Sequence, residues 1–164
     1  MKELAQIRTA VLTSLREAGL AALEAFPEGE IKRYAGAVAA VAVGAATGGN
    51  LGFCNYLGET WDEESGTVRE LYGKQLESDI AVDVRAERAA DCEEGCQKAA
   101  EVLLGGLPAG IRPGELRWEA LVWEKATGMF LRKGHLLCQA VFVAQSQEEG
   151  ELFLDFILKG VMQN

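Results

Sequence analysis

The sequence predicts an α+β fold, a mainly antiparallel sheet packed by an N-terminal helix and one further helix. Apolar residues recur with a helical period near the start of the chain and again in its middle. Alternating apolar and polar residues fill the last third, as in half-buried strands. With 164 residues, 49% of them hydrophobic and 25% charged, the chain has the composition of an ordinary globular protein, so we expect a single domain over 1–164.

The first predicted element is an amphipathic helix over residues 3–26. Its apolar residues recur at steps of three and four: Leu4, Ile7, Val11, Leu15, Ala18, Ala22 and Phe26. Pro27 and Gly29 are expected to end it. Residues 36–46 follow, with valines inside an alanine run. Periodicity does not separate a buried strand from a buried helix there, but the flanking glycines and the short length favour a strand.

Residues 47–74 form the most suggestive segment outside the predicted core. They are rich in glycine and carry the aromatic residues Phe53, Tyr56, Trp61 and Tyr72. This composition predicts a long excursion or a projecting hairpin, and a loop of more than about 12–15 residues in a compact domain is usually functional or flexible.

A strand and a second helix are expected next. The strand covers residues 76–85, where apolar and charged residues alternate. Asp91 is expected to open the helix, with Glu94 completing a capping box. Gly105 and Gly106 supply its C-terminal stop.

The last third is expected to be all-β. The predicted strands cover residues 116–124, 136–143 and 152–158, with a turn at 126–128. In the first of them, Trp118, Ala120 and Val122 would share one face, so that Trp118 and Trp123 point to opposite faces. Leu152, Leu154, Phe156 and Leu158 would share a side of the last strand. Short linkers imply antiparallel neighbours.

Charge and hydropathy exclude several partners. The chain has 16 basic and 25 acidic residues, a net charge of −9, and its basic residues are scattered, so we expect no specific nucleic-acid binding. The longest apolar stretch, residues 35–46, is too short to span a bilayer, which needs about 20 residues. The first residues lack the apolar region of a secretory signal. We therefore expect no membrane partner and synthesis in the cytoplasm.

The four cysteines are Cys54, Cys92, Cys96 and Cys138. Cys92 and Cys96 are four residues apart on the second predicted helix, a spacing that a metal site could use. His135 is the single histidine, so a site of four ligands would have to recruit the other cysteines as well. Buried, reduced core cysteines explain the pattern better, and we predict no metal.

Motifs for catalysis are weak. Residues 44–49 are glycine-rich but lack the Lys-Ser/Thr pair of a phosphate-binding loop, which favours a flexible turn after a strand. His135 has no nucleophile motif beside it and is expected at the surface or rim. The acidic groups 62–64 and 148–149 are expected in solvated turns. We predict no catalytic residue, no cofactor and no enzymatic activity.

Exposed aromatic residues point instead to protein–protein contact. Aromatic side chains are enriched at interface hot spots. The candidate interface residues are Phe53, Tyr56, Trp61, Tyr72 and Trp123. The alternative is that the first four fold back over the sheet.

The element order, the length and the acidic balance resemble the small tail-terminator, or tail-completion, proteins of long-tailed phages and prophages. The segments that carry the likeness are residues 2–26, 37–43 and 80–85, the helix from Asp91, and the closing strands that end near Met162. The resemblance implies a ring of about six subunits that caps the tail tube, stops its polymerisation and joins it to the head. It implies copies of the chain and tail-tube or connector proteins as partners, the virion tail as location, and no catalytic residue.

Two alternatives follow from the same residues. One is another phage head–tail connector or minor tail component. The other is a small-molecule-binding or enzymatic α+β domain that would use the glycine-rich segment and a pocket near His135.

Overall fold

The computed structural model describes residues 2–26, 34–50, 56–145 and 156–159. The fold is α+β, as predicted, with two helices in the described residues and a mostly antiparallel sheet. The helices are α1 (Lys2–Glu17) and α2 (Ala89–Gly105). The strands are β1 (Ala21–Leu23), β2 (Val38–Asn50), β3 (Tyr56–Asp62), β4 (Thr67–Ala86), β5 (Ile111–Trp118), β6 (Val122–Glu124), β7 (Met129–Gln145) and β8 (Ile157–Leu158).

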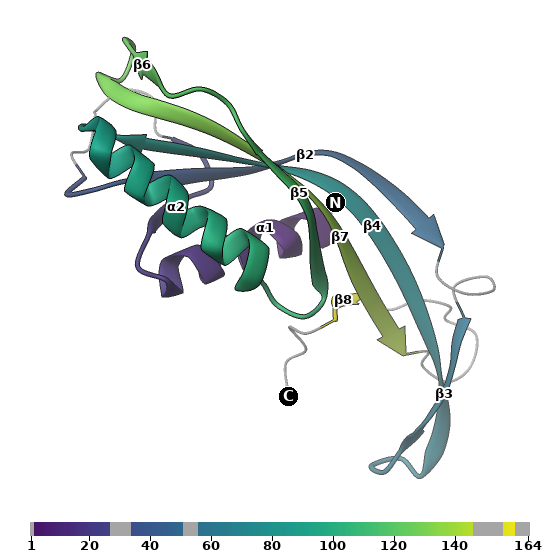
Figure 1. Cartoon of the computed structure of the whole chain (residues 1–164). Coiled ribbons are helices and arrows are strands. Elements are labelled where there is room, and N and C mark those ends of the chain that lie inside the picture. Colours follow the sequence, from purple (N-terminus) through teal and green to yellow (C-terminus); the bar gives the residue numbers. More distant parts are fainter. Residues whose placement is uncertain (1, 27–33, 51–55, 146–155, 160–164) are drawn as a thin grey trace.

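Both helices lie on the same face of the sheet, so the protein has two layers (Figure 1). The strand order is β1-β2-β4-β7-β5, with β3 beside β4 and both β6 and β8 beside β7. Every pairing is antiparallel except that of β1 with β2. On β4, alternate residues from Leu76 to Ala86 are buried beneath the helices. The opposite face of the sheet carries no helix of the described residues (Figure 1).

Strands β4 and β7 are the two longest strands and lie side by side inside the sheet. They have 20 and 17 residues and pair continuously from Leu71↔Gln145 to Ala86↔Phe130. At about 3.3 Å per residue, β4 spans roughly 65 Å. The sequence predicted strands in both places, over 76–85 and 136–143, but both are longer because they continue past the helices. The sheet curves along this length (Figure 1).

The predicted helix over 3–26 is too long: α1 ends at Glu17. Gly19 has a φ of 85°, a left-handed conformation that glycine adopts readily. The Gly19 N–H donates to the Arg16 carbonyl and the Leu20 N–H to the Leu15 carbonyl, at 3.0 and 3.1 Å. These two bonds form a Schellman motif, which closes the helix and turns the chain into β1.

Residues 36–46 contain a strand, as favoured, and β2 continues to Asn50. The glycine-rich residues 44–49 therefore lie within a strand, and the expected flexible turn is wrong. A register shift between Val43 and Ala46 marks a bulge in this strand. The excursion over 47–74 is correspondingly shorter, and its second half is the hairpin of β3 and β4.

Helix α2 begins two residues before the predicted start. Its N-cap is Arg88, whose side chain makes no capping hydrogen bond, so the expected capping box of Asp91 and Glu94 is wrong. Asp91 lies in the first turn and pairs with Arg88 at 3.1 Å, where a negative charge favours the helix dipole. The predicted stop is confirmed, because α2 ends at Gly105.

The predicted strand over 116–124 is interrupted. Trp118 lies opposite Gly134, whereas Val122 lies opposite Leu131, so the chain inserts one extra residue against β7 between β5 and β6. An insertion of one residue exchanges the faces of the strand. The register therefore places Trp118 and Trp123 on the same face, and the expected opposite placement is wrong. The turn at 126–128 is confirmed, with Gly128 at a φ of 67°.

The end of the chain is described only in part. Of the predicted strand over 152–158, β8 forms the last two residues, and Leu152 and Leu154 lie outside the described residues. The Glu148–Glu149 group also lies outside them. Neither α1 nor α2, the helices found in the described ranges, has the length and apolar character needed to cross a membrane.

Candidate functional site

A hairpin extends beyond the body of the molecule and is called the arm here. It consists of residues 56–72, with β3, the turn at 63–66 and the start of β4. Strand β7 stops pairing with β4 at Leu71, so Thr67–Glu70 have β3 as their only partner strand among the described residues. Figure 1 shows the arm projecting past both helices.

Local hydrogen bonds explain why the arm turns where it does. The Asp62 carboxylate accepts the Glu64 N–H at 3.0 Å and pairs with Arg69 at 2.7 Å. A hydrogen bond from the Ser65 side chain lowers the pKa of Asp62. Gly66, with a φ of 63°, donates its N–H to the Asp62 carbonyl at 2.9 Å. The acidic group at 62–64 therefore includes a turn-forming residue, in line with the expected solvated turn.

Apolar side chains gather on one face of the arm. Trp61 lies directly opposite Val68, and their exposed fractions are 61% and 54%. Tyr56 lies opposite Tyr72 on the same face, and the two rings meet edge to face at 5.9 Å. A two-stranded hairpin is at best marginally stable in water. An exposed apolar face on such a hairpin favours contact with a partner.

A second exposed apolar group lies at the opposite end of β4. Ala86 pairs with Phe130, and Phe130 pairs with Trp123 of β6. The Trp123 ring packs edge to face on Phe130 at 4.9 Å, yet Trp123 and Val122 remain 55% and 50% exposed. Figure 1 shows β6 and the arm at opposite ends of the molecule.

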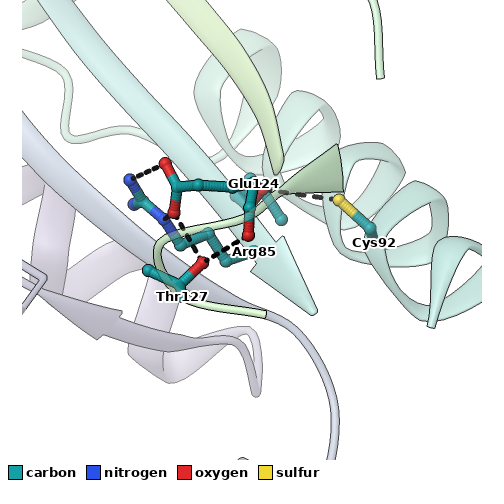
Figure 2. A network of polar contacts seen from close by, with 5 residues as sticks. Arg85, Cys92, Glu124 and Thr127 are labelled. Atoms are coloured by element: carbon teal, nitrogen blue, oxygen red, sulfur yellow. Dashed lines mark hydrogen bonds and ion pairs between the residues drawn. The ribbon is translucent and has the colours of Figure 1, made fainter. Parts of the chain in front are cut away.

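An ion pair fixes the turn that carries Trp123. The Arg85 guanidinium donates to both carboxylate oxygens of Glu124, at 2.9 and 3.3 Å, and the Thr127 hydroxyl donates to the same carboxylate at 2.6 Å (Figure 2). Such a two-point contact is geometrically specific. It ties β6 and the following turn to β4, so Trp123 is presented from a rigid support.

This ion pair predicts a pH dependence of stability. The hydrogen bond from Arg85 holds the pKa of Glu124 below its ordinary value of 4.5. A carboxyl whose pKa is lower in the folded state stabilises the protein above pH 4.5 and loses that contribution as the pH falls through the folded pKa. Glu124→Gln should therefore lower the free energy of unfolding by about 1 kcal/mol at pH 7 and have no effect at strongly acidic pH.

Urea unfolding of both proteins from pH 7 to pH 3 measures this difference. Glu93→Gln, at an exposed position of α2, is the matched control and should change nothing. A difference between wild type and Glu124→Gln that stays constant over the whole range would contradict the assignment.

The two long edges of the sheet differ in their protection. Beyond its three pairs with β1, the outer edge of β2 has no partner strand among the described residues, and residues 41–50 contain neither a charge nor a proline. Strand β5, on the other edge, carries Arg112, Pro113, Glu115 and Arg117. Charged residues and proline protect an edge against pairing with another chain. The exposed part of the β2 edge has neither charges nor proline, and its bulge between Val43 and Ala46 is the one irregularity there in the described residues.

The predicted interface residues fall into two groups. Tyr56, Trp61 and Tyr72 share a face of the arm, Trp123 lies at the opposite end, and Phe53 is outside the described residues. Sequence analysis missed Val68 and Val122, which are as exposed as the tryptophans beside them. Val68, Glu70 and Tyr72 follow one another at steps of two, which places Val68 on the same strand face as Tyr72. This spacing was the available signal for Val68.

The residues considered for catalysis do not converge. His135 lies on the sheet face away from the helices, 4.0 Å from Asp79 and 3.5 Å from Glu119, whereas the glycine-rich residues 44–49 belong to the far half of β2. A hollow of about 370 Å³ lies between β1 and α2, lined among others by Tyr34, Asp91 and Lys98, and His135 is not part of it.

The described cysteines are buried in the core. Cys92 and Cys96 are 0% and 5% exposed on the inner face of α2, and the Cys92 thiol donates to the Val84 carbonyl at 3.4 Å. The contact with Cys92, together with burial, raises the pKa of Cys96, and burial raises that of Cys138. Cys54 lies outside the described residues. Within the ranges that the structure covers, no three potential ligands gather as a metal site would require.

Comparisons with known proteins find likenesses among solved structures. No protein-family description and no curated protein sequence matches the chain. Among solved structures, the chain is similar to one from the "Virion of native gene transfer agent (GTA) particle". The two are 19% identical with a TM-score of 0.40, and the match covers 84% of this chain and 94% of the other.

Proposed function

We propose that this protein is a structural subunit of a phage or prophage tail, resembling a tail terminator. Copies of it would form a ring that caps the tail tube and joins it to the head. The observation that carries the proposal is the arm, a two-stranded projection with Trp61 and Val68 exposed on one face. A projecting segment with an exposed apolar face gains further stability from contact with another protein.

The position of the second apolar group supports assembly into a ring. Trp61 and Trp123 lie at opposite ends of β4, roughly 60 Å apart along the strand, so they cannot meet within one chain. A contact between unlike surfaces of identical subunits repeats with a constant rotation and closes as a ring when that rotation permits. The net charge of −9 also suits a passage for DNA, because phosphates find few attractive contacts there.

The proposed role contains no chemical step. The side chains considered for catalysis are dispersed over the sheet, and His135 is not part of the hollow between β1 and α2. We therefore place the function in the shape and surfaces of the subunit, and we propose that it is not an enzyme.

Co-sedimentation with tail-tube subunits tests the proposal. Purified tail-tube subunits and purified head–tail connector proteins would be mixed separately with this protein. We expect the protein to sediment with assembled tubes and to limit their growth. Binding to the connector alone would favour the alternative of a connector component, and binding to neither would contradict the proposal.

A further inference from the structure

The two apolar ends of the molecule carry opposite net charges. The arm segment 56–70 has five acidic residues and one arginine, a net charge of −4. Residues 117–135, called the far end here, have four basic and two acidic residues, a net charge of +2. In a chain with a net charge of −9, a positive far end is a local exception. Its charge complements that of the arm.

The charged groups on both surfaces are accessible. Glu59, Glu63 and Glu64 are exposed on the arm, and Arg117, Lys125 and Lys133 are exposed at the far end. Across the described ranges, the ion pairs within 4.0 Å include none of these six side chains. None of the six is held in a close ion pair within the described part of the chain, although Lys133 lies opposite Asp83 on β4 and its charge acts on the Asp83 and Glu124 carboxylates.

We propose that the arm of one copy docks on the far end of the next copy. Trp61 and Val68 would pack on Val122, which lies on the same face of the sheet as Arg117 and Lys133. The arm carboxylates would face these two basic residues and Lys125. The proposal names the contact by which the ring of the proposed function is built, and it rests on that function. Complementary charges set the orientation and prevent an arm from docking on another arm.

The geometry within one subunit suits this contact. The Arg85–Glu124 pair holds the far end rigid, while Asp62 and Arg69 order the tip of the arm. Both surfaces are thus ordered before they meet, which lowers the entropic cost of association. Because the surfaces differ, each copy can use its arm and its far end at the same time.

Charge exchange tests the contact. Glu59→Lys/Glu63→Lys/Glu64→Lys gives a basic arm, with a net charge of +2 over residues 56–70, and Lys125→Glu/Lys133→Glu gives an acidic far end, with a net charge of −2 over residues 117–135. Each variant alone should self-associate at least about tenfold more weakly than wild type, because like charges then meet. A 1:1 mixture of the two variants, and a single chain that carries both exchanges, should regain association.

Sedimentation velocity over a range of protein concentrations measures these changes. Glu93→Lys/Glu94→Lys/Glu101→Lys is the matched control, since it makes the same charge change as the arm variant at three exposed positions of α2 and should associate like wild type. Circular dichroism of every variant verifies that it is folded.

Failure of this contact and failure of the proposed function give different results. The arm-to-far-end contact would be overturned if the single charge-exchange variants associate like wild type. It would also be overturned if the 1:1 mixture of the two variants associates no better than either variant alone. A wild-type protein that stays monomeric both alone and with tube subunits would overturn it too. Binding to tube subunits would then show separately whether the tail function stands.

Discussion

Replacing Leu136 by alanine is expected to lower the free energy of unfolding by about 2–5 kcal/mol. Leu136 is fully buried on β7, on the face that the helices cover, and it contributes to the core. Removing its side chain loses transfer free energy and leaves a cavity beneath the helices. A loss of this size is a large part of the stability of a single domain.

The same substitution at Leu137 is the matched control. Leu137 is the next residue of the strand but points to the other face, where 46% of it is exposed, so Leu137→Ala should change the unfolding free energy by less than about 1 kcal/mol. Urea unfolding of both variants measures the contrast. Equal effects at the two positions would mean that the sheet does not have one covered and one open face.

Removing the arm is expected to abolish self-association while the body stays folded. Tyr56 and Tyr72 lie opposite each other at the base of the arm, so residues 57–71 can be replaced by Asn-Gly, which favours a two-residue hairpin turn. The free energy of unfolding of the shortened protein should lie within about 1 kcal/mol of the wild-type value, because the removed residues are largely exposed and add little to the core.

Analytical ultracentrifugation and urea unfolding of the shortened protein separate the two effects. The expected result is a monomer of near-normal stability that fails to sediment with tail tubes. A shortened protein that still assembles would show that the arm is dispensable, and one that fails to fold would show that the arm belongs to the core. Either result would contradict the assigned role of the arm.

Much of the fold could be predicted because one pattern dominates each element. The alternation at residues 80–85 and the helical stripe from Cys92 to Leu103 both indicate burial on one side. The end of α1 could not be located from its stripe, because Leu20, just before β1, and Ala22 within β1 are also buried, at 4% exposure each. The apolar spacing therefore continues past the turn, and Gly19 is the residue that marks the end of α1.

The interruption between β5 and β6 was hidden for a different reason. Apolar and polar residues alternate over 116–120, but the apolar run 120–123 does not show which face each side chain takes. The one-residue shift depends on the pairing with β7, which only the tertiary structure reveals. For the candidate site, the aromatic residues of the arm were visible in the sequence. Their separation from Trp123 was not, because it depends on the length of β4.

Electron micrographs of the wild-type protein mixed with tail-tube subunits test most directly whether it works as an assembly subunit. We expect rings with a single subunit number, seated at the ends of tubes of limited length. Bare tubes that keep growing, with this protein left free in solution, would contradict that role.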